Sequence, residues 1–305
     1  YGIHSAMPCS QAYKRCPHAH FITPRMSRYR EISLQIHTIF KQYTDLVEPL
    51  SLDEAFLDIT NNHKGQDSAT IIARQICAQI FEETGLTASA GVSCNKFVAK
   101  VASDLNKPNG ISVIRPHEIP SFLSSLPIGK FFGVGKVTAK KMKQLGIHTG
   151  RELKTLRKET LIQQFGKAGR YFYEVAQGED NRPVVPNRER KSLGAEHTYE
   201  EDLSSLDEVD AQIEKLSDKV ARRLDKARKS GRTLTVKVKF ADFSQITRSI
   251  TAPVNFEKSA DIADRSKSIM KEVFEDGMAI RLLGITISNF LQPEQEEAQL
   301  TLGFE

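Results

Sequence analysis

Two adjacent carboxylates, Asp53 and Glu54, stand in the middle of PLSLDEAFLDI, residues 49–59, where apolar residues otherwise alternate as in a half-buried strand. Successive side chains of a regular strand point to opposite faces, so the two acids serve one site only if the chain turns there. Carboxylates held close together repel each other, and a shared cation lowers that cost. Oxygen ligands of this kind suit Mg²⁺. A polar pair in an ordinary turn is the alternative.

Short elements must surround this pair to position it. Residues 47–51 and 55–59 can form the two strands of a hairpin with the acids in its connection. The order of elements predicts one sheet with helices on one face. The further elements expected are a helix over 31–43, a helix that begins after Asp67 or Ser68, carries Ile72, Ile76 and Ile80 and ends at Gly85, a strand over 86–92, a helix over 95–106 and a strand after Gly110.

Lys107 stands next to Pro108, which must end the helix over 95–106. A long cationic side chain at that place can reach a phosphate, and a solvated lysine stabilised by the helix dipole is the alternative. The helix divides into an apolar stripe of Val98, Val101, Ala102 and Leu105 and another face with Lys96, Lys100 and Ser103.

Residues 118–180 carry several short helical patterns and no strand signal. Gly133 and Gly135 bracket a turn that opens a helix, where the backbone can approach a phosphate and the free N–H groups of the helix N-terminus can bind it. Simple helix punctuation is the alternative. We expect an inner face of Val134, Thr138, Met142 and Leu145, with Lys136, Lys140 and Lys143 pointing outward. Residues 118–187 hold 12 basic and 6 acidic side chains, a balance expected of a nucleic-acid contact but also of a solvated face.

Residues 182–192, RPVVPNRERKS, have two prolines and no periodicity, which predicts a linker. Beyond it we expect an α+β unit with a four-stranded sheet. Its elements are a first strand, a helix over 206–230, strands over 232–241 and 245–252, a helix over 258–275 and a strand over 280–290. One face of this sheet carries Lys237, Lys239, Thr247 and Ser249, which can bond to phosphates along a groove, although plain polar-out alternation explains them too.

The chain of 305 residues suits two or three domains, and its 39% hydrophobic and 27% charged residues are typical of a globular protein. No apolar run approaches the ~18 residues of a membrane span, so we expect a cytoplasmic monomer with no membrane partner. The cysteines form no CxxC pair, and the HxH of His18 and His20 has no second ligand pair, which argues against a zinc site.

Four stretches, YGIHSAMP, EPLSLDEAFLDIT, TASAGVSCNKFVAKVASDLNKPNG and LPIGKFFGVGKVTAKKMKQLGI, resemble motifs of the Y-family DNA polymerases, the enzymes of translesion synthesis, and of their bacterial DNA polymerase IV branch. The resemblance covers essentially the whole chain, with the motifs in family order. It implies an α+β multidomain right-hand polymerase with a ferredoxin-like palm, an all-helical helix-hairpin-helix thumb and an α+β little finger. The implied boundaries are 1–24 for the rest of the fingers, 25–117 for the palm, 118–185 for the thumb, 186–192 for the linker and 193–305 for the little finger with its tail.

The resemblance also implies roles for single residues. Asp53 becomes a ligand of two catalytic Mg²⁺ ions, and Glu54 a ligand or activator beside the primer 3′ hydroxyl. Lys107 matches the lysine that contacts the incoming deoxynucleoside triphosphate. Tyr29 lies where the family has a tyrosine near the nucleotide, with core packing as the alternative. The thumb glycines and lysines and the polar sheet face become contacts to primer–template DNA.

The end of the chain, QLTLGFE, follows the polar run QPEQEE and is expected to be a tail. Its residues Gln299, Leu300, Leu302 and Phe304 resemble the peptide by which bacterial polymerases bind the sliding clamp, and a final edge strand is the alternative.

Family members begin with a strand that carries a further metal-binding aspartate, and Tyr1 stands after that region, so we expect one ligand and one palm strand to be missing. Two hypotheses follow. The first is a magnesium-dependent DNA polymerase of low fidelity that acts in translesion synthesis. The second is a module that binds DNA and the clamp without catalysis.

Overall fold

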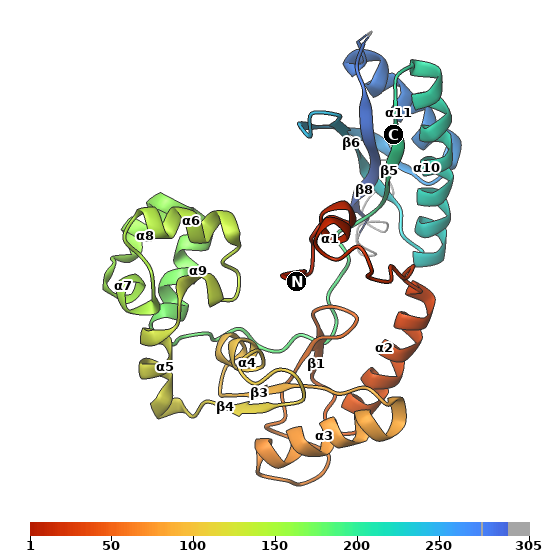
Figure 1. Ribbon diagram of the computed structural model, residues 1–305. Coiled ribbons are helices and arrows are strands. Elements are labelled where there is room, and N and C mark those ends of the chain that lie inside the picture. Colours follow the sequence, from red (N-terminus) through yellow and green to blue (C-terminus); the bar gives the residue numbers. More distant parts are fainter. Residues whose placement is uncertain (276, 292–305) are drawn as a thin grey trace, which may run out of the picture. The chain divides into compact units, whose positions relative to one another are not determined.

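The computed structural model describes residues 1–275 and 277–291. The chain divides into an N-terminal unit, Tyr1–Arg188, and a C-terminal unit, Glu189–Glu305 (Figure 1). The boundary between the units falls inside the proline-containing stretch that follows the helical segment. None of the described helices combines the length and the apolar character needed to cross a bilayer.

The two acids lie in a hairpin of the N-terminal unit, as predicted. Val47 pairs with Leu57 and Pro49 with Ala55 in an antiparallel ladder. The elements up to this point are α1 (Cys9–Arg15), α2 (Met26–Lys41), β1 (Val47–Pro49) and β2 (Ala55–Leu57).

Helix α3 (Ala69–Thr84) has both of its predicted ends. Ser68 Oγ accepts the Ile71 N–H at 3.4 Å, which satisfies one of the free donors of the first turn. Gly85 ends the helix with a φ of +71°, a left-handed conformation that glycine adopts without strain. The residues spaced four apart on α3 are buried together with Ile39 and Tyr43, namely Ile72, Ile76 and Ile80.

The strand pairing of the N-terminal unit differs from the expected single sheet. Strands β3 (Ala90–Val92) and β4 (Ile111–Val113) form a parallel ladder of their own, and within residues 1–188 the two ladders do not join. The strand expected from residue 86 begins only at Ala90, because Leu86 is exposed and pairing starts where the Ala90 N–H donates to Gly110 O at 3.0 Å.

Helix α4 (Lys96–Ala102) is shorter than the helix expected over 95–106. Asn95 begins it by accepting the Val98 N–H at 2.9 Å. The chain leaves the helix at Ser103, so Leu105 is 48% exposed and does not belong to the apolar stripe. The remaining members of the predicted stripe are buried, namely Val98, Val101 and Ala102.

A helical bundle follows, and it contains no strand, in agreement with the sequence pattern. Phe97 of α4 belongs to the same buried cluster as Met142, Leu153 and Leu161 of the bundle, so α4 and the bundle share one core. The bundle consists of η1 (Pro116–Glu118), α5 (Ile119–Ser125), η2 (Ile128–Lys130), α6 (Lys136–Gln144), α7 (Gly150–Thr155), α8 (Lys158–Phe165) and α9 (Lys167–Ala176).

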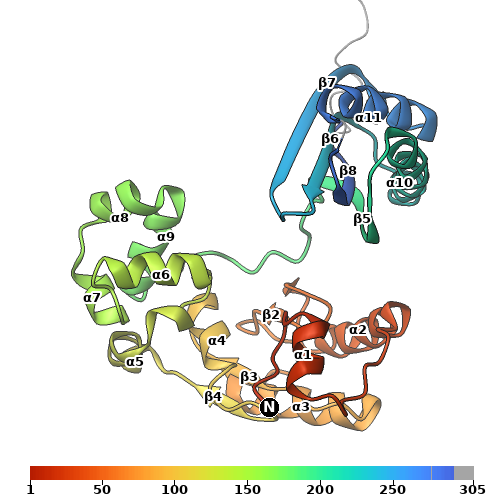
Figure 2. The same cartoon turned by 45° about the horizontal axis from the view of Figure 1, so that its top comes forward.

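The C-terminal unit is the predicted α+β unit with a four-stranded antiparallel sheet in the order β5-β8-β6-β7. Figure 2 shows α10 and α11 on one side of this sheet. Its elements are β5 (Ser192–Leu203), α10 (Leu206–Ala227), β6 (Gly231–Phe240), β7 (Gln245–Phe256), α11 (Ser259–Val273) and β8 (Ile280–Phe290).

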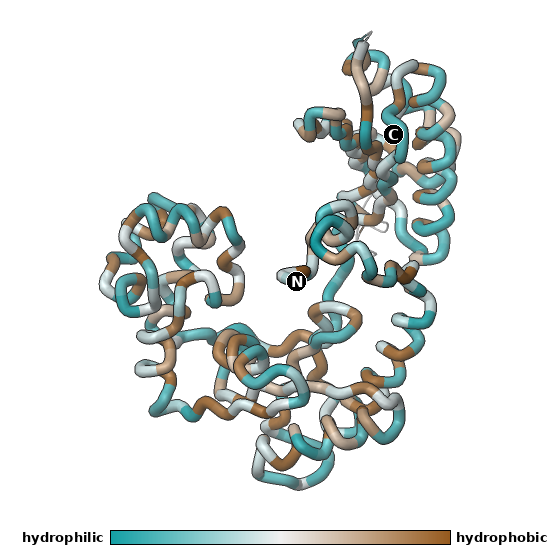
Figure 3. The backbone as a smooth tube through the Cα atoms, viewed as in Figure 1, coloured by the Kyte–Doolittle hydropathy of each residue, from teal (hydrophilic) through white to brown (hydrophobic). Residues whose placement is uncertain are grey.

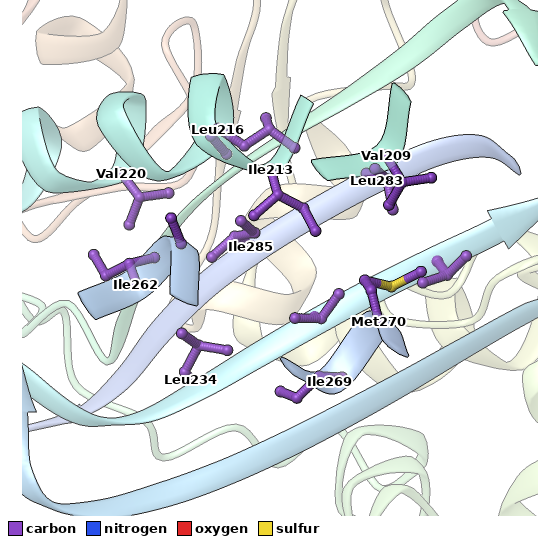
Figure 4. Close-up of a cluster of buried hydrophobic side chains, with 14 of the residues drawn as sticks. Val209, Ile213, Leu216, Val220, Leu234, Ile262, Ile269, Met270, Leu283 and Ile285 are labelled. Atoms are coloured by element: carbon purple, nitrogen blue, oxygen red, sulfur yellow. The ribbon is translucent and has the colours of Figure 1, made fainter. Parts of the chain in front are cut away.

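The core of the C-terminal unit lies between the two helices and the sheet (Figure 4). Along α10, hydrophilic and hydrophobic stretches alternate, as expected of a helix with one buried side (Figure 3). The helices contribute Val209, Ile213, Leu216, Val220, Ile262, Ile269 and Met270, and the strands contribute Leu234, Leu283 and Ile285. Because this face of the sheet is covered, its other face is free to carry polar side chains.

Gly91 allows α4 to lie directly on β3. A Cβ atom at Gly91 would lie 1.9 Å from Ala99 O and 2.5 Å from Ser103 N, both backbone atoms that cannot rotate away. The position of α4 against the parallel ladder therefore depends on the absence of a side chain here.

We predict that Gly91→Ala lowers the free energy of unfolding by about 3 kcal/mol or more, because overpacking against backbone forces the helix to shift. Gly135→Ala is the matched control, since no atom lies within 4 Å of the added Cβ. Urea unfolding of both variants measures the difference. Equal stability of the two variants would contradict the close packing of α4 on β3.

Candidate functional site

The connection between β1 and β2 turns tightly and brings Asp53 and Glu54 to one end of the hairpin. The N–H groups of Leu50 and Ser51 both donate to Glu54 O, at 2.8 and 3.2 Å. Ser51 Oγ donates to Asp53 Oδ1 at 2.6 Å and holds that carboxylate at the turn. The predicted bend of the chain at the two acids is thereby confirmed. Asp53 is exposed, whereas Glu54 is half-buried.

A row of alternating charges leads from Glu54 to Lys107. Lys100 Nζ lies 3.3 Å from Glu54 Oε1 and 3.5 Å from Asp104 Oδ2, and Lys107 Nζ lies 2.6 Å from Asp104 Oδ1. The Lys100 side chain is only 14% exposed, whereas that of Lys107 is 52% exposed. Of the two lysines, Lys107 is thus the one that can turn toward a ligand in solution.

Asp104 and Lys107 stabilise each other's charged forms. The hydrogen bond to Asp104 raises the pKa of Lys107 despite partial burial, and the charges of Glu54 and Asp53 act in the same direction. Burial acts to raise the pKa of Asp104, but the hydrogen bond from Lys107 and the charge of Lys100 outweigh it and hold that pKa below its usual range.

One cleft, with a volume of about 530 Å³, collects these charged groups. Asp53, Glu54, Lys100 and Lys107 all line it, and its remaining walls come mainly from α2, α3, β2, β3 and α4. Carboxylates can hold a cation and lysines can hold phosphates, so the cleft has the donors needed for a metal-bound polyphosphate.

The carboxylates fit Mg²⁺ in number and type. Mg²⁺ usually takes only one or two protein carboxylates and completes its shell with water and substrate phosphates. Ser51 bonds to Oδ1 of Asp53 and Lys100 lies beside Oε1 of Glu54, which leaves the second oxygen of each carboxylate for a cation. Across residues 1–275 and 277–291, no group of three or more His, Cys, Asp or Glu side chains is placed to hold a metal. The magnesium site therefore stays a prediction.

The predicted nucleotide-binding residues have different surroundings. Lys107 lines the cleft, but it does not stand at the end of a helix, because α4 ends at Ala102 and Lys107 follows in the turn beyond it. Tyr29 is 46% exposed on α2, which rules out core packing, and it is not among the residues that line the cleft. The structure therefore joins Lys107, but not Tyr29, to the two acids.

Sequence reasoning missed Lys100 and Asp104 as members of the site. The sequence pattern places Lys100 only on a polar helix face, together with Lys96, and neither of these lysines is solvated. Their side chains are 14% and 11% exposed, because each of them pairs with a carboxylate of the hairpin. The spacing of four residues between Lys100 and Asp104, which is typical of helical ion pairs, was the available signal.

The N-terminus of α6 forms a second candidate site. Gly133 has a φ of +92°, a conformation that disfavours other residues, and Gly135 caps the helix without a side-chain partner for the free N–H groups. Lys136, Lys140 and Lys143 point outward as predicted, and none of them takes part in an ion pair within the described residues. Val134 and Met142 are buried as expected. Leu145 is 46% exposed instead, because α6 ends at Gln144 and the chain turns at Gly146.

The open face of the C-terminal sheet carries the predicted polar residues in cross-strand rows. Thr235 and Ser249 are hydrogen-bonded at 2.8 Å, and Lys237 pairs in register with Thr247. Lys237 also reaches across Gly284 of β8 to Glu196 at 2.9 Å. Lys239 Nζ lies 4.8 Å from the ring centre of Phe243. Among the described residues the Thr247 hydroxyl has no hydrogen-bond partner, whereas Ser249, Lys237 and Lys239 already have partners.

The predicted clamp-binding residues lie outside the described residues. They are Gln299, Leu300, Leu302 and Phe304, and their role stays a prediction.

Models of one protein family match most of the chain. The impB/mucB/samB family matches residues 1–104, the IMS family HHH motif matches residues 116–147, and the impB/mucB/samB family C-terminal domain matches residues 190–302. The middle match covers the N-terminus of α6, where the sequence predicted a helix-hairpin-helix.

Curated relatives and solved structures agree with these matches. The DNA polymerase IV of Alkalilimnicola ehrlichii is 48% identical over 98% of this chain and 84% of its own length, and that of Clostridioides difficile is 49% identical over 99% and 83%. A Y-family DNA polymerase chimera of Dbh and Dpo4 has a TM-score of 0.87 at 26% identity, over 95% of this chain and 84% of its own. An insertion ternary complex of Dbh DNA polymerase has a TM-score of 0.61 at the same identity and coverage.

The predicted fold class, an α+β multidomain polymerase with a helix-hairpin-helix segment, is confirmed by these similarities. Sequence motifs, family models and relatives thus converge on one assignment. The chain belongs to the Y family of DNA polymerases, in the impB/mucB/samB group, together with bacterial proteins named DNA polymerase IV.

Proposed function

We propose that the protein is a template-directed, magnesium-dependent DNA polymerase of low fidelity that acts in translesion synthesis. The observation that carries the proposal is the cleft in which Asp53 and Glu54 stand beside Lys100 and Lys107. This arrangement of carboxylates and lysines supports a cation site next to a triphosphate site. Support also comes from relatives named DNA polymerase IV and from similar structures described as ternary complexes of a DNA polymerase.

The residues of the cleft would divide the work between them. Asp53 and Glu54 would hold two Mg²⁺ ions, which when bound stabilise the charge that develops on the attacking and leaving oxygens of nucleotidyl transfer. Lys107 would leave Asp104 and bind the phosphates of the incoming deoxynucleotide. Lys100 is too buried to leave with it, so its role is to fix the orientation of Glu54.

Primer–template DNA would be held by backbone contacts that do not depend on base sequence. The free N–H groups and the lysines of α6 suit phosphates, and the hydroxyl rows of the C-terminal sheet supply further hydrogen bonds. We further propose a cytoplasmic monomer whose C-terminal residues bind the sliding clamp.

The alternative is a module that binds DNA and the clamp without catalysis. It is supported by the phosphate-binding features of α6 and of the C-terminal sheet, which do not depend on the two acids. Primer extension by the chain with Mg²⁺ and all four deoxynucleotides separates the two functions. Duplex binding without any extension would leave only the alternative.

We predict that Asp53→Ala slows primer extension by about 1000-fold, the equivalent of about 4 kcal/mol in the barrier, because one ligand of the cations is lost. Affinity for primer–template DNA should change by less than twofold. Single-turnover kinetics measure the first quantity and fluorescence anisotropy the second. Asp67→Ala, an exposed acid outside the cleft, serves as the control and should extend normally. Normal extension by Asp53→Ala would reject the metal-ligand role.

We predict that Lys107→Ala raises the KM for deoxynucleotides roughly 10- to 100-fold, as expected for the loss of a hydrogen bond between charged groups, with a smaller effect on kcat. Steady-state titration of each nucleotide measures both constants. Lys154→Ala removes an exposed lysine that does not line the cleft and should leave KM unchanged. An unchanged KM in Lys107→Ala would mean that the triphosphate binds elsewhere.

We predict that Lys136→Ala and Lys140→Ala each weaken duplex binding to the same degree for any sequence and lower the slope of log K against log salt by about 1. The physical reason is the loss of one phosphate contact and its released counterion. Binding titrations between 50 and 200 mM salt, on the order of the physiological range, measure this slope. Lys154→Ala again provides the comparison. A loss of affinity that differs between DNA sequences would argue against backbone recognition by α6.

A further inference from the structure

A buried ion pair lies behind the hairpin that carries the two acids. Glu48 of β1 accepts a hydrogen bond from Lys96 of α4, and their side chains are only 6% and 11% exposed. The Lys96 ammonium group also lies 5.0 Å from the ring centre of Phe56, which stands opposite Glu48 in β2. Lys96 therefore contacts both strands of the hairpin at once.

The segment that follows α9 completes this cluster. The Val185 N–H donates to Glu48 Oε2 at 2.9 Å, and Lys96 donates to Pro183 O at 3.0 Å. Two further contacts fasten the same segment to the first turn of α4. Asn95 Nδ2 donates to Gly178 O at 3.0 Å, and the Phe97 N–H donates to Asp180 Oδ2 at 2.8 Å.

Such a cluster is an unusual way to stabilise a protein. Removing two charges from water is costly, and a well-packed apolar pair of the same volume is often as stable or more stable. An ion pair with several hydrogen bonds instead fixes the local geometry, because each hydrogen bond allows only a narrow range of distances and angles. The cluster thus restricts where the hairpin can lie relative to α4.

The same helix contacts the hairpin a second time, one turn further on. Lys96 binds Glu48 on strand β1, and Lys100 lies 3.3 Å from Glu54 in the connection. Lys96 and Lys100 are about one turn apart on the same helix. Because the helix backbone is rigid, fixing the position of Lys96 also fixes the position from which Lys100 contacts Glu54. Glu48 itself does not line the cleft and touches neither Asp53 nor Glu54.

We propose that Glu48 is a positioning residue, which acts through Lys96 and helix α4 to hold the connection of residues 50–54 in the geometry that binds metal. The inference rests on the proposed function for its consequence in catalysis. Its structural part, the immobilisation of the connection, can be measured without any activity.

The test compares three variants by hydrogen exchange of the backbone amides. Glu48→Gln removes the charge but keeps an acceptor for the Val185 N–H. The double variant Glu48→Gln/Lys96→Met removes both charges, so no unpaired charge is left buried. Leu153→Ala is the control, since it weakens the shared core at α7, where Leu153 is fully buried, and removes no charged group.

We expect the amides of Leu50 and Ser51, both bonded to Glu54 O, to exchange at least tenfold faster in Glu48→Gln and in the double variant. Exchange in α7 and α8 should stay as in the parent protein. The double variant should regain thermal stability but not this protection, whereas a merely structural pair would regain both. In Leu153→Ala the connection should stay protected. If Glu48→Gln does not fold, the double variant gives the same comparison.

The Mg²⁺ concentration for half-maximal primer extension should rise at least fivefold in the variants that lack Glu48, and not in Leu153→Ala. Parent-like protection of Leu50 and Ser51 in the double variant would overturn the inference, and so would an unchanged Mg²⁺ requirement. Failure of the proposed function is a separate result, because it would appear as normal extension by Asp53→Ala.

Discussion

The placement of two acids, Asp53 and Glu54, in one tight connection is the constraint on which the rest of the site depends. The tight connection of the hairpin brings two negative charges to the cleft. Neighbouring like charges do not stabilise the folded state by themselves. Partial compensation comes from Ser51, which donates to Asp53, and from Lys100, which lies beside Glu54. Each partner contacts only one oxygen of its carboxylate. In the proposed function, a bound cation supplies the missing positive charge.

Most of the structure around the hairpin acts by fixing α4. Gly91 allows the helix to lie on β3, Asn95 begins it, and Phe97 joins it to the core of the helical bundle. With α4 placed in this way, Lys96 meets Glu48 and Lys100 meets Glu54. The turn after the helix then brings Lys107 to the same cleft. A short helix of seven residues thereby connects the candidate metal ligands to the candidate phosphate ligand.

Many of the features predicted correctly from the sequence depend on near neighbours. The hairpin, the caps at Ser68 and Gly85 and the outward lysines of α6 follow from local backbone preferences and periodicity. The failures depend on contacts between distant segments. The structure has two separate ladders where a single sheet was expected. Lys96 is buried by contacts with Glu48 and Pro183, and these partners could not be predicted because they lie 48 and 87 residues away in the chain. The predicted positions of Leu105 and Leu145 on apolar helix faces were wrong for another reason, since the exact ends of short helices are hard to predict. The roles of single residues came from family resemblance rather than from physical patterns.

The most direct test of the account is a high-resolution structure of the protein with primer–template DNA, an incoming nucleotide that cannot react, and Mg²⁺. The account predicts Asp53 and Glu54 oxygens about 2.1 Å from bound Mg²⁺, and Lys107 turned from Asp104 to the triphosphate. Lys100 should stay beside Glu54. Carboxylate oxygens turned away from every bound ion, with Lys107 still paired to Asp104, would contradict it.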